Sequence, residues 1–300
     1  MPCHEVEIHV FPPLKEETQD DLYSLTRFPD DAVRLRNPHI QEMEQDILYH
    51  LALGSGSHDL VEMFSDVRFV CMGGTPKRME VLCFSHGMGI PSVGILLHEV
   101  IKLMYHAKCK NPIFFRLGTC GGIGIEGGNL PVLGKMQRRP AILDKQLAND
   151  LKNLHCDTDP FSVTVGKTMC TYDFYEGQGR LDGAFCDYKE EDKLEFLQKI
   201  HDANVVNMEM ESLCFAALCQ HAGIKAAVIC VTLLNRLHGD QVSTPKETLN
   251  KWQEYPQMLV ARYIKKQIGL PFDIPQREHP QVVKNPKQAH MVRQESACFE

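Results

Sequence analysis

Short apolar runs alternate along most of this chain with longer segments in which apolar residues recur every three or four positions. The first pattern is typical of buried strands and the second of amphipathic helices. The clearest helix opens at Pro91-Ser92, and one face of it carries Val93, Leu96, Leu97, Val100, Ile101 and Met104. The same patterns predict strands at 67–72, 81–85, 113–117, 161–165, 204–208 and 226–231. They predict further helices at 39–50, 143–154, 189–202, 211–221 and 246–267.

This alternation of strands and helices predicts an α/β fold in three layers, α/β/α, with a central mixed sheet covered on both faces. We expect residues 37–269 to form the folded domain. Residues 1–36 are polar, and we expect a flexible N-terminal segment there. Residues 270–300 contain several prolines and little periodicity, which is typical of a disordered tail.

One connection does not fit this alternation. Only Thr75 to Glu80 separates the turn at Gly73-Gly74 from the predicted strand that begins at Val81. A crossover between parallel strands normally takes a dozen or more residues. These two strands therefore either pair antiparallel, or part of an ancestral fold is missing between them. A second irregular region follows Gly122, where glycines crowd a stretch with no clear strand.

The composition is that of a soluble globular protein, with 43% apolar and 24% charged residues among 300. A net charge of −7 argues against nucleic acid or an anionic membrane as the main partner, although a local arginine cluster can still bind a small anion. The sequence contains no apolar run of membrane-spanning length, and its acidic N-terminus gives no signal-peptide pattern.

The cysteines and histidines give no sign of a metal site. The 12 cysteines include no Cys-x-x-Cys pair, and several stand inside apolar runs. We interpret them as buried free thiols in a reducing compartment, not as disulfide partners or zinc ligands. The 14 histidines show no ligand spacing. The expectation is a cytoplasmic protein without a bound metal.

Two glycine-rich turns follow predicted strands and stand beside arginines. The first runs from Gly73 to Arg78, and the second runs from Arg116 to Gly122. Glycine lets backbone N–H groups approach an anion closely, and arginine matches the geometry of phosphate oxygens. Either stretch could instead be an ordinary turn that closes a strand, because short glycine motifs often match by chance.

The loop at 171–182 combines aromatic residues with a Gly-Gln-Gly-Arg stretch. The amide of Gln178 can meet a planar edge that offers both a donor and an acceptor, as uracil does. Phe174 can stack on such a ring, and Arg180 can hold a carbonyl oxygen that gains charge. The alternative is a solvated surface loop, which is weaker because such loops rarely combine so many recognition groups.

Two acidic residues, Glu209 and Glu211, stand between an apolar strand and an apolar helix. Burying carboxylates there is costly, and hydrogen bonds from the two neighbouring hydroxyls of a ribose would offset the cost. Capping of the helix would explain either residue alone. His86 also follows a predicted strand, where a histidine is more often structural than catalytic.

Together these stretches closely resemble animal uridine phosphorylases of the nucleoside phosphorylase family. The resemblance covers most of 37–268, and its most specific part is Phe174–Arg180, which separates uridine phosphorylases from purine-directed relatives. It implies a nucleoside phosphorylase-like fold. The matching stretches are 46–50, 66–74, 85–92, 116–119, 168–184, 209–212 and 230–237.

The resemblance implies a phosphate site shared between two subunits. Gly74, Arg116 and Thr119 would bind phosphate, and Arg78 would come from the neighbouring subunit. His50 would reach the ribose end from the other subunit as well. A homodimer with shared active sites is therefore implied.

The resemblance also implies the reaction, which is the reversible phosphorolysis of uridine to uracil and ribose 1-phosphate in pyrimidine salvage. Gln178 and Arg180 would recognise uracil beside Phe174, and with Arg116 they would carry the catalysis of this pentosyltransferase. No cofactor is implied, because inorganic phosphate is a co-substrate. The ribose would be held by Glu209, Met210 and Glu211.

Two stretches of the family have no counterpart here. After Arg78 the family carries a helix, a loop and a strand with a Gly-Thr-Asp-Arg-Tyr stretch, whose arginine is another phosphate ligand. After Gly128 it continues into a further strand and loop, which are replaced here by Asn129-Leu130-Pro131, so the losses lie near 79–80 and 129–131. Two internal losses with intact flanks indicate exon skipping or an imperfect gene model, and they predict reduced activity. The alternatives are an inactive isoform that acts only as a dimerisation partner, and a phosphorylase with broadened use of deoxyuridine or thymidine.

Overall fold

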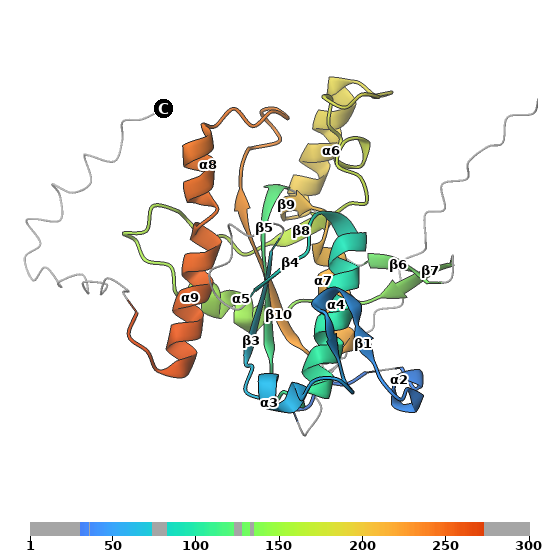
Figure 1. Ribbon diagram of the computed structural model, residues 1–300. Helices are drawn as coiled ribbons and strands as arrows, with labels where there is room; N and C mark the ends of the chain where they lie inside the picture. The colour runs from blue at the N-terminus through green and yellow to red at the C-terminus, as the bar shows by residue number, and fades with distance from the viewer. Residues whose placement is uncertain (1–30, 36, 74–82, 123–127, 133–134, 273–300) are drawn as a thin grey trace, which may run out of the picture.

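The computed structural model describes residues 31–35, 37–73, 83–122, 128–132 and 135–272 (Figure 1). Gly74 and Arg78, two of the predicted phosphate ligands, lie outside these residues. Most of the predicted flexible segment 1–36 and of the predicted tail 270–300 also lies outside them, so the domain boundaries remain predictions.

A six-stranded sheet forms the centre of the described chain. One of its strand pairs, β5 with β9, is antiparallel, and the other pairs are parallel. The sheet is therefore mixed, as predicted. Its order is β4 (Cys83–Ser85), β3 (Phe69–Gly73), β5 (Ile113–Gly122), β9 (Val205–Glu209) and β8 (Lys167–Cys170), and β10 (Lys225–Thr232) also pairs with β5.

Alternate residues of the central strands face two separate cores, which is why these strands are apolar on both faces. Met72 and Phe114 are buried with α4 (Gly89–His106) and α7 (Ser212–His221). Cys71 and Phe115 are buried on the other face with α5 (Lys145–Lys152) and α9 (Tyr255–Ile268). Figure 1 shows α9 and the α4–α7 pair on opposite sides of the sheet. The three-layer prediction is confirmed.

A third, smaller core lies at the β8–β9 end of the sheet. Leu197 and Ile200 of α6 (Glu190–Asp202) are buried there against Val205 and Met208 of β9. The chain between β8 and α6 contains the short 3-10 turn η3 (Glu176–Gln178). Because both flanking elements pack on β9, this loop is anchored beside the end of that strand.

The short connection after Gly73 joins parallel strands, so the antiparallel alternative is wrong. Cys71 pairs with Cys83 and Gly73 with Ser85 in parallel register. β4 has only three residues, and a strand of that length advances only about 10 Å. The connection itself, at 74–82, lies outside the described residues.

The predicted helix at 39–50 is wrong. The structure has α2 (His39–Glu42) and the 3-10 turn η1 (Tyr49–Leu51), between which β1 (Ile47–Leu48) pairs antiparallel with β2 (Leu53–Gly54). Ala52 has a φ of 54°, a left-handed conformation that a helix cannot continue through. The Glu99 carboxylate accepts hydrogen bonds from the backbone N–H groups of His50 and Leu51, at 2.9 and 3.1 Å.

Three further predictions differ from the structure. Residues 161–165 form no strand, and β8 begins only after Gly166, where an added Cβ would lie 2.5 Å from the Val206 side chain. The long helix predicted at 246–267 is two helices, α8 (Lys246–Trp252) and α9, because Pro256 lies in the first turn of α9. Beyond Gly122, the hairpin of β6 (Gly128–Val132) and β7 (Lys135–Arg139) occupies a region without a predicted strand. The remaining short helix is α3 (Leu60–Phe64), capped by Asp59.

A buried ion pair fastens the segment before β1 to α4. The Asp46 carboxylate accepts hydrogen bonds from Lys102 at 2.6 Å and from His106 at 2.8 Å. Burial works to raise the pKa of Asp46, but the hydrogen bonds and charges of these two side chains outweigh it and hold the pKa below its usual value. Ionised Asp46 therefore stabilises the folded state at neutral pH, and the contribution is lost as pH falls through the lowered pKa.

Asp46→Asn is expected to lower the free energy of unfolding by about 2 kcal/mol at pH 7, because it weakens hydrogen bonds to a charged group. The difference from wild type should shrink as pH falls below about 4, where the wild-type carboxyl also becomes protonated. Urea denaturation of both proteins at several pH values measures this difference in the free energy of unfolding. Asp202→Asn, at a carboxylate that is 66% exposed, is the control and should change little.

Candidate active site

A buried arginine lies between two carboxylates at one end of the sheet. Arg116 projects from β5, and its Nη1 lies 3.0 Å from Glu209 Oε2. Its Nη2 donates a hydrogen bond to Glu211 Oε2. An added Cβ at Gly118 would lie 2.6 Å from Arg116 Nη1, so only glycine leaves room for the guanidinium against the strand. The sequence therefore brings one predicted phosphate ligand into contact with two predicted ribose ligands.

The same two carboxylates anchor the first turns of two helices. Glu209 accepts hydrogen bonds at 2.9 Å from the backbone N–H groups of Glu211 and Ser212, where α7 begins. Glu211 Oε1 accepts one at 2.7 Å from the N–H of Gly89, the first residue of α4. Negative charge is stabilised at helix N-termini. These bonds fix the positions of both carboxylates before any ligand binds.

Burial and neighbouring charge shift the pKa values of Arg116, Glu209 and Glu211 in opposite directions. Burial raises the pKa of Glu209, and Arg116 only partly offsets the effect. Burial also works to raise the pKa of Glu211, but the Arg116 charge and the Gly89 N–H hold it below its usual value. Burial works to lower the pKa of Arg116, whereas Glu209 raises it, and the guanidinium stays charged. The cluster thus holds a permanent cation beside an ionised Glu211.

The predicted recognition loop is partly buried. Gln178 and Arg180 are 3% and 7% exposed, which argues against a solvated surface loop. Gln178 Nε2 donates a hydrogen bond to Thr171 Oγ1 at 3.1 Å. Arg180 Cζ lies 4.4 Å from the centre of the Phe174 ring, within cation–π distance, and Phe174 is half-exposed. An amide, a guanidinium and an aromatic ring therefore gather in one place.

One residue connects this loop to the arginine–carboxylate cluster. Thr171 follows β8, and its backbone N–H donates a hydrogen bond to the Glu209 carbonyl at 2.9 Å. Its hydroxyl is the partner of Gln178. The two groups of predicted site residues are thus neighbours through Thr171, as a nucleoside site requires.

Other predicted site residues have different positions. Thr119 is half-buried on β5 opposite Val231, three residues beyond Arg116. Met210 lies between Glu209 and Glu211 and is close to Gly89. His50 is on η1, where its Nδ1 lies 2.7 Å from Glu99 on α4, so within this chain it does not join the Arg116 or Arg180 clusters. His86 is buried, and its charge contributes to the lowered pKa of Glu211.

The structure adds three buried charged residues to which the sequence analysis assigned no role: Lys193, Arg236 and Asp240. Arg236 Nη2 donates a hydrogen bond to the Gln178 carbonyl at 2.9 Å, and Asp240 accepts from the backbone N–H of Leu181. The sequence does offer a signal for Arg236, which stands two residues after the apolar pair Leu233-Leu234. A charge in apolar surroundings must find a partner, so a buried ion pair could have been expected there.

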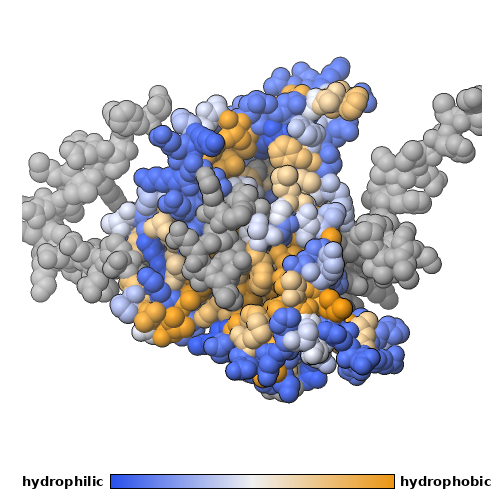
Figure 2. Space-filling model, in the orientation of Figure 1, coloured by the Kyte–Doolittle hydropathy of each residue, from blue (hydrophilic) through white to orange (hydrophobic). Residues whose placement is uncertain are grey.

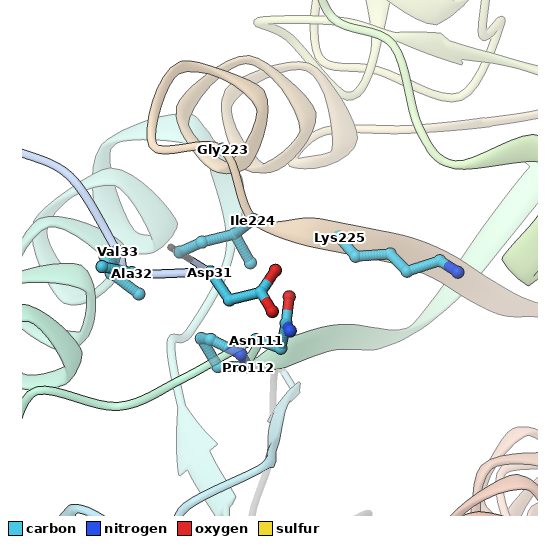
Figure 3. Close-up of a pocket in the computed structure, with 8 residues that line it drawn as sticks. All are labelled: Asp31, Ala32, Val33, Asn111, Pro112, Gly223, Ile224 and Lys225. Atoms are coloured by element: carbon cyan, nitrogen blue, oxygen red, sulfur yellow. The ribbon is translucent and has the colours of Figure 1, made fainter. Parts of the chain in front are cut away.

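Two cavities of the described residues lie elsewhere. Figure 3 shows the smaller, with about 10 Å³ of space between Asp31, Asn111 and Ile224, which is room for about one water molecule. The larger, about 320 Å³, is lined by Arg68, Lys225 and neighbouring residues. Neither is lined by a predicted site residue. Among the described residues, no His, Cys, Asp and Glu cluster could hold a metal, and no helix is long and apolar enough to cross a membrane.

Comparisons with known proteins agree with this geometry. The family model described as "Phosphorylase superfamily" matches residues 133–265. Uridine phosphorylase 1 of Mus musculus is 44% identical, over 80% of this chain and 94% of its own length. This chain belongs to the uridine phosphorylase family. The alignment with this relative also supports the internal losses. It has 293 positions, but 80% of this chain is only about 240 residues, so this chain has gaps at about 50 of the aligned positions.

The fold of the uridine phosphorylase family is confirmed by a solved structure. Uridine phosphorylase from Schistosoma mansoni in complex with thymidine matches with a TM-score of 0.73 and 34% identity, over 79% of this chain and 99% of that one. Another relative from the same organism is named inactive uridine phosphorylase B and is 34% identical, over 78% of this chain and 96% of its own length. Family membership and activity are therefore separate questions.

Proposed function

We propose that this chain binds uridine and cleaves it with inorganic phosphate, giving uracil and ribose 1-phosphate, as a pentosyltransferase of pyrimidine salvage. The observation that carries the proposal is the hydrogen bond from Thr171 to the Glu209 carbonyl. It joins a loop suited to a pyrimidine to a cluster suited to a ribose and an anion. A close relative that is named for the same activity supports it.

The pyrimidine end offers the polar groups that uracil needs. Among the described residues, Gln178 Oε1 accepts no hydrogen bond and can take the ring N–H. The hydrogen bonds of Arg180 use Nε and Nη2, so its Nη1 remains for a carbonyl oxygen of the ring. Phe174 would lie beside the ring. These donors would stabilise the negative charge that reaches uracil as the bond to ribose stretches.

The ribose and phosphate would bind at the arginine–carboxylate cluster. Glu211, with Glu209 and Met210, would hold the ribose hydroxyls, and Arg116 with Thr119 and Gly74 would hold phosphate. In phosphorolysis an oxygen of phosphate attacks the anomeric carbon, and the electron pair of the bond to uracil leaves with the base. The transition state has oxocarbenium character. No metal, nicotinamide or covalent nucleophile is needed for this step.

Arg116 already pairs with two carboxylates through Nη1 and Nη2, so phosphate must compete with them for these two donors, whereas Nε has no partner among the described residues. The formal charge of Arg116, Glu209 and Glu211 together is −1, and it rises to 0 where buried His86 is charged, so anion binding needs further cations. Arg78 of a second subunit would be one such cation. The arginine of the absent family segment would be another. We therefore propose reduced activity in this form.

We also propose a homodimer that completes the site. His50, half-exposed and oriented by Glu99, would reach the ribose of the partner subunit. Exposed apolar side chains flank it in the chain at Ile47 and Tyr49, Met88 is exposed before α4, and Figure 2 shows apolar patches on the face that it draws. Such surface is typical of an interface between subunits. A cytoplasmic location is part of the proposal, supported by the free thiols among the described cysteines.

The purified chain is expected to release uracil from uridine only when inorganic phosphate is present. With one arginine of the phosphate site absent, turnover should be on the order of 10²- to 10³-fold slower than that of a complete relative. The change in ultraviolet absorbance on cleavage measures it. Equal release without phosphate would identify a hydrolase instead.

Two further results would decide between the alternatives. No turnover, followed by recovery when the family segment is inserted after Met79, would identify an inactive isoform that acts as a dimerisation partner. Similar rates for uridine and thymidine would identify broadened use, because Glu211 should favour substrates with a 2′-hydroxyl.

A further inference from the structure

The Asp240 carboxylate collects hydrogen bonds from three separate segments of the chain. It accepts one from the backbone N–H of Leu181, one from Arg236 Nε and one from Lys193 Nζ, each at 2.9 Å. Leu181 belongs to the recognition loop, Lys193 to α6, and Arg236 to the chain after β10. Asp240 is only 8% exposed, and Lys193 and Arg236 are 5% and 1% exposed. A buried carboxylate with this many donors holds those segments in one arrangement.

Both predicted recognition residues are tied to Asp240. Arg180 Nη2 donates to the Asp240 carbonyl oxygen at 2.6 Å. Arg236, held by the Asp240 carboxylate, donates to the carbonyl oxygen of Gln178 at 2.9 Å. The loop at 178–181 therefore makes three contacts with Asp240 or with Arg236, through Gln178, Arg180 and Leu181. Asp182 completes the arrangement by binding Arg180 Nε and Nη2 at 2.8 and 2.7 Å.

The cluster carries excess positive charge. It contains three cations, Arg180, Lys193 and Arg236, but only two carboxylates, Asp182 and Asp240. The formal charges of this set of ion pairs therefore sum to +1, and the exposed carboxylates of the same loop, Asp173 and Glu176, lie outside the set. Asp240 contacts two of the three cations through its carboxylate, so it limits their repulsion while the excess remains available to a ligand that gains negative charge.

We propose that Asp240, with Lys193 and Arg236, positions Gln178 and Arg180 for a pyrimidine that leaves as an anion. The inference rests on the proposed function for the identity of the ligand. Asp240 is a positioning residue, since it acts through the loop and does not touch the pyrimidine. Its loss should therefore harm recognition of the base more than binding of phosphate.

Asp240→Asn tests the proposal in the full-length chain. Lys193 and Arg236 share Oδ1 of Asp240, and the Leu181 N–H binds Oδ2, so the NH₂ group of an asparagine would face either the two cations or the Leu181 N–H, and that side would lose its acceptor. Amide hydrogen exchange of residues 174–182 is expected to become at least about tenfold faster, because local opening costs less free energy. Exchange in β5 and α9 should change no more than in the control. Unchanged protection of 174–182 would overturn the proposal whether or not the chain is an enzyme.

The matched control is Asp159→Asn. Asp159 is also a carboxylate with two hydrogen bonds to one arginine, Arg262, both at 2.6 Å, and with one backbone donor, Cys156. It lies in the chain between α5 and β8 and binds α9 through Arg262, so it is not part of the recognition loop. This variant should lose stability without faster exchange at 174–182. Equal loosening of the loop in both variants would show that Asp240 has only a general structural role.

Ligand measurements separate this inference from the proposed function. In Asp240→Asn, kcat/KM for uridine is expected to fall roughly 100-fold, as for a misplaced binding group, while KM for phosphate stays within about twofold. A fall in kcat/KM for uridine together with a rise of much more than twofold in KM for phosphate would contradict positioning of the base. Uracil binding to the wild type by calorimetry tests the proposed function itself. If uracil fails to bind, that function is wrong, and hydrogen exchange still decides the role of Asp240.

Lys193→Gln keeps the test decisive if Asp240→Asn does not fold. It removes one of the two cations on the Asp240 carboxylate and should loosen residues 174–182 to a smaller extent. Lys193→Arg, which restores the charge, should return the exchange rate toward that of the wild type. Identical exchange in Lys193→Gln and wild type would contradict the proposal.

Discussion

Arg116→Met is expected to lower the free energy of unfolding by about 3–5 kcal/mol, because it leaves two buried carboxylates without their cation. The Arg116 side chain is 3% exposed, and those of Glu209 and Glu211 are 2% and 10% exposed, so water cannot replace it. Urea denaturation at pH 7 measures the loss. The deficit should shrink on acidification, since unpaired buried carboxyls have raised pKa values and gain protons in the folded state first.

A double variant distinguishes lost charge pairing from lost packing. Arg116→Met combined with Glu211→Gln removes one of the stranded charges and should recover part of the stability. Arg262→Met is the control, because it strands only the single carboxylate of Asp159 and should cost less. Arg116→Met with wild-type stability at pH 7 would contradict the charge cluster described above.

Arg180→Ala is expected to reduce kcat/KM for uridine by about 10²–10³, the usual effect of losing one donor to a developing negative charge. Arg180 is the group whose free Nη1 would meet the ring, and its stacking on Phe174 would be lost as well. Phosphate-dependent uracil release measures the effect. If turnover of the wild type is too slow, calorimetric titration with uracil gives the same comparison.

Tyr188→Phe serves as the control for Arg180→Ala. The Tyr188 hydroxyl donates a hydrogen bond to the Arg180 carbonyl at 2.6 Å, so the variant disturbs the same residue without removing its guanidinium. It should keep most of the activity. Equal losses in the two variants would show that the loop conformation matters and that the guanidinium itself does not.

Sequence patterns predicted the central layers because both faces of the central strands are buried. Val70 and Phe114 face one core and Cys71 and Phe115 the other, which produces continuous apolar runs that periodicity identifies. The predicted helix at 39–50 is wrong for the opposite reason. Its conformation depends on Glu99, almost fifty residues away, which holds the backbone of His50.

The residues of the candidate site also divide into those that the sequence revealed and those that it did not. Gln178, Arg180, Glu209 and Glu211 could be found because unusual polar residues stand together in the sequence. Asp240 could not, because its partners at 181, 193 and 236 come together only in the folded chain. Single-sequence reasoning therefore finds residues proposed to contact a ligand more readily than those proposed to hold them in place.

The Arg116 cluster at the ribose end and the Asp240 cluster at the pyrimidine end differ in charge, which creates an electrostatic potential gradient across the proposed site. At the ribose end Arg116, Glu209 and Glu211 sum to a formal charge of −1, or to 0 with a charged His86, whereas the ion pairs at the pyrimidine end sum to +1. A nucleoside bound across this potential gradient would have its glycosidic bond polarised toward the base, even before phosphate arrives. Nucleosides whose uncharged pyrimidine ring carries a strongly electron-withdrawing substituent should therefore be cleaved with the least help from the phosphate side.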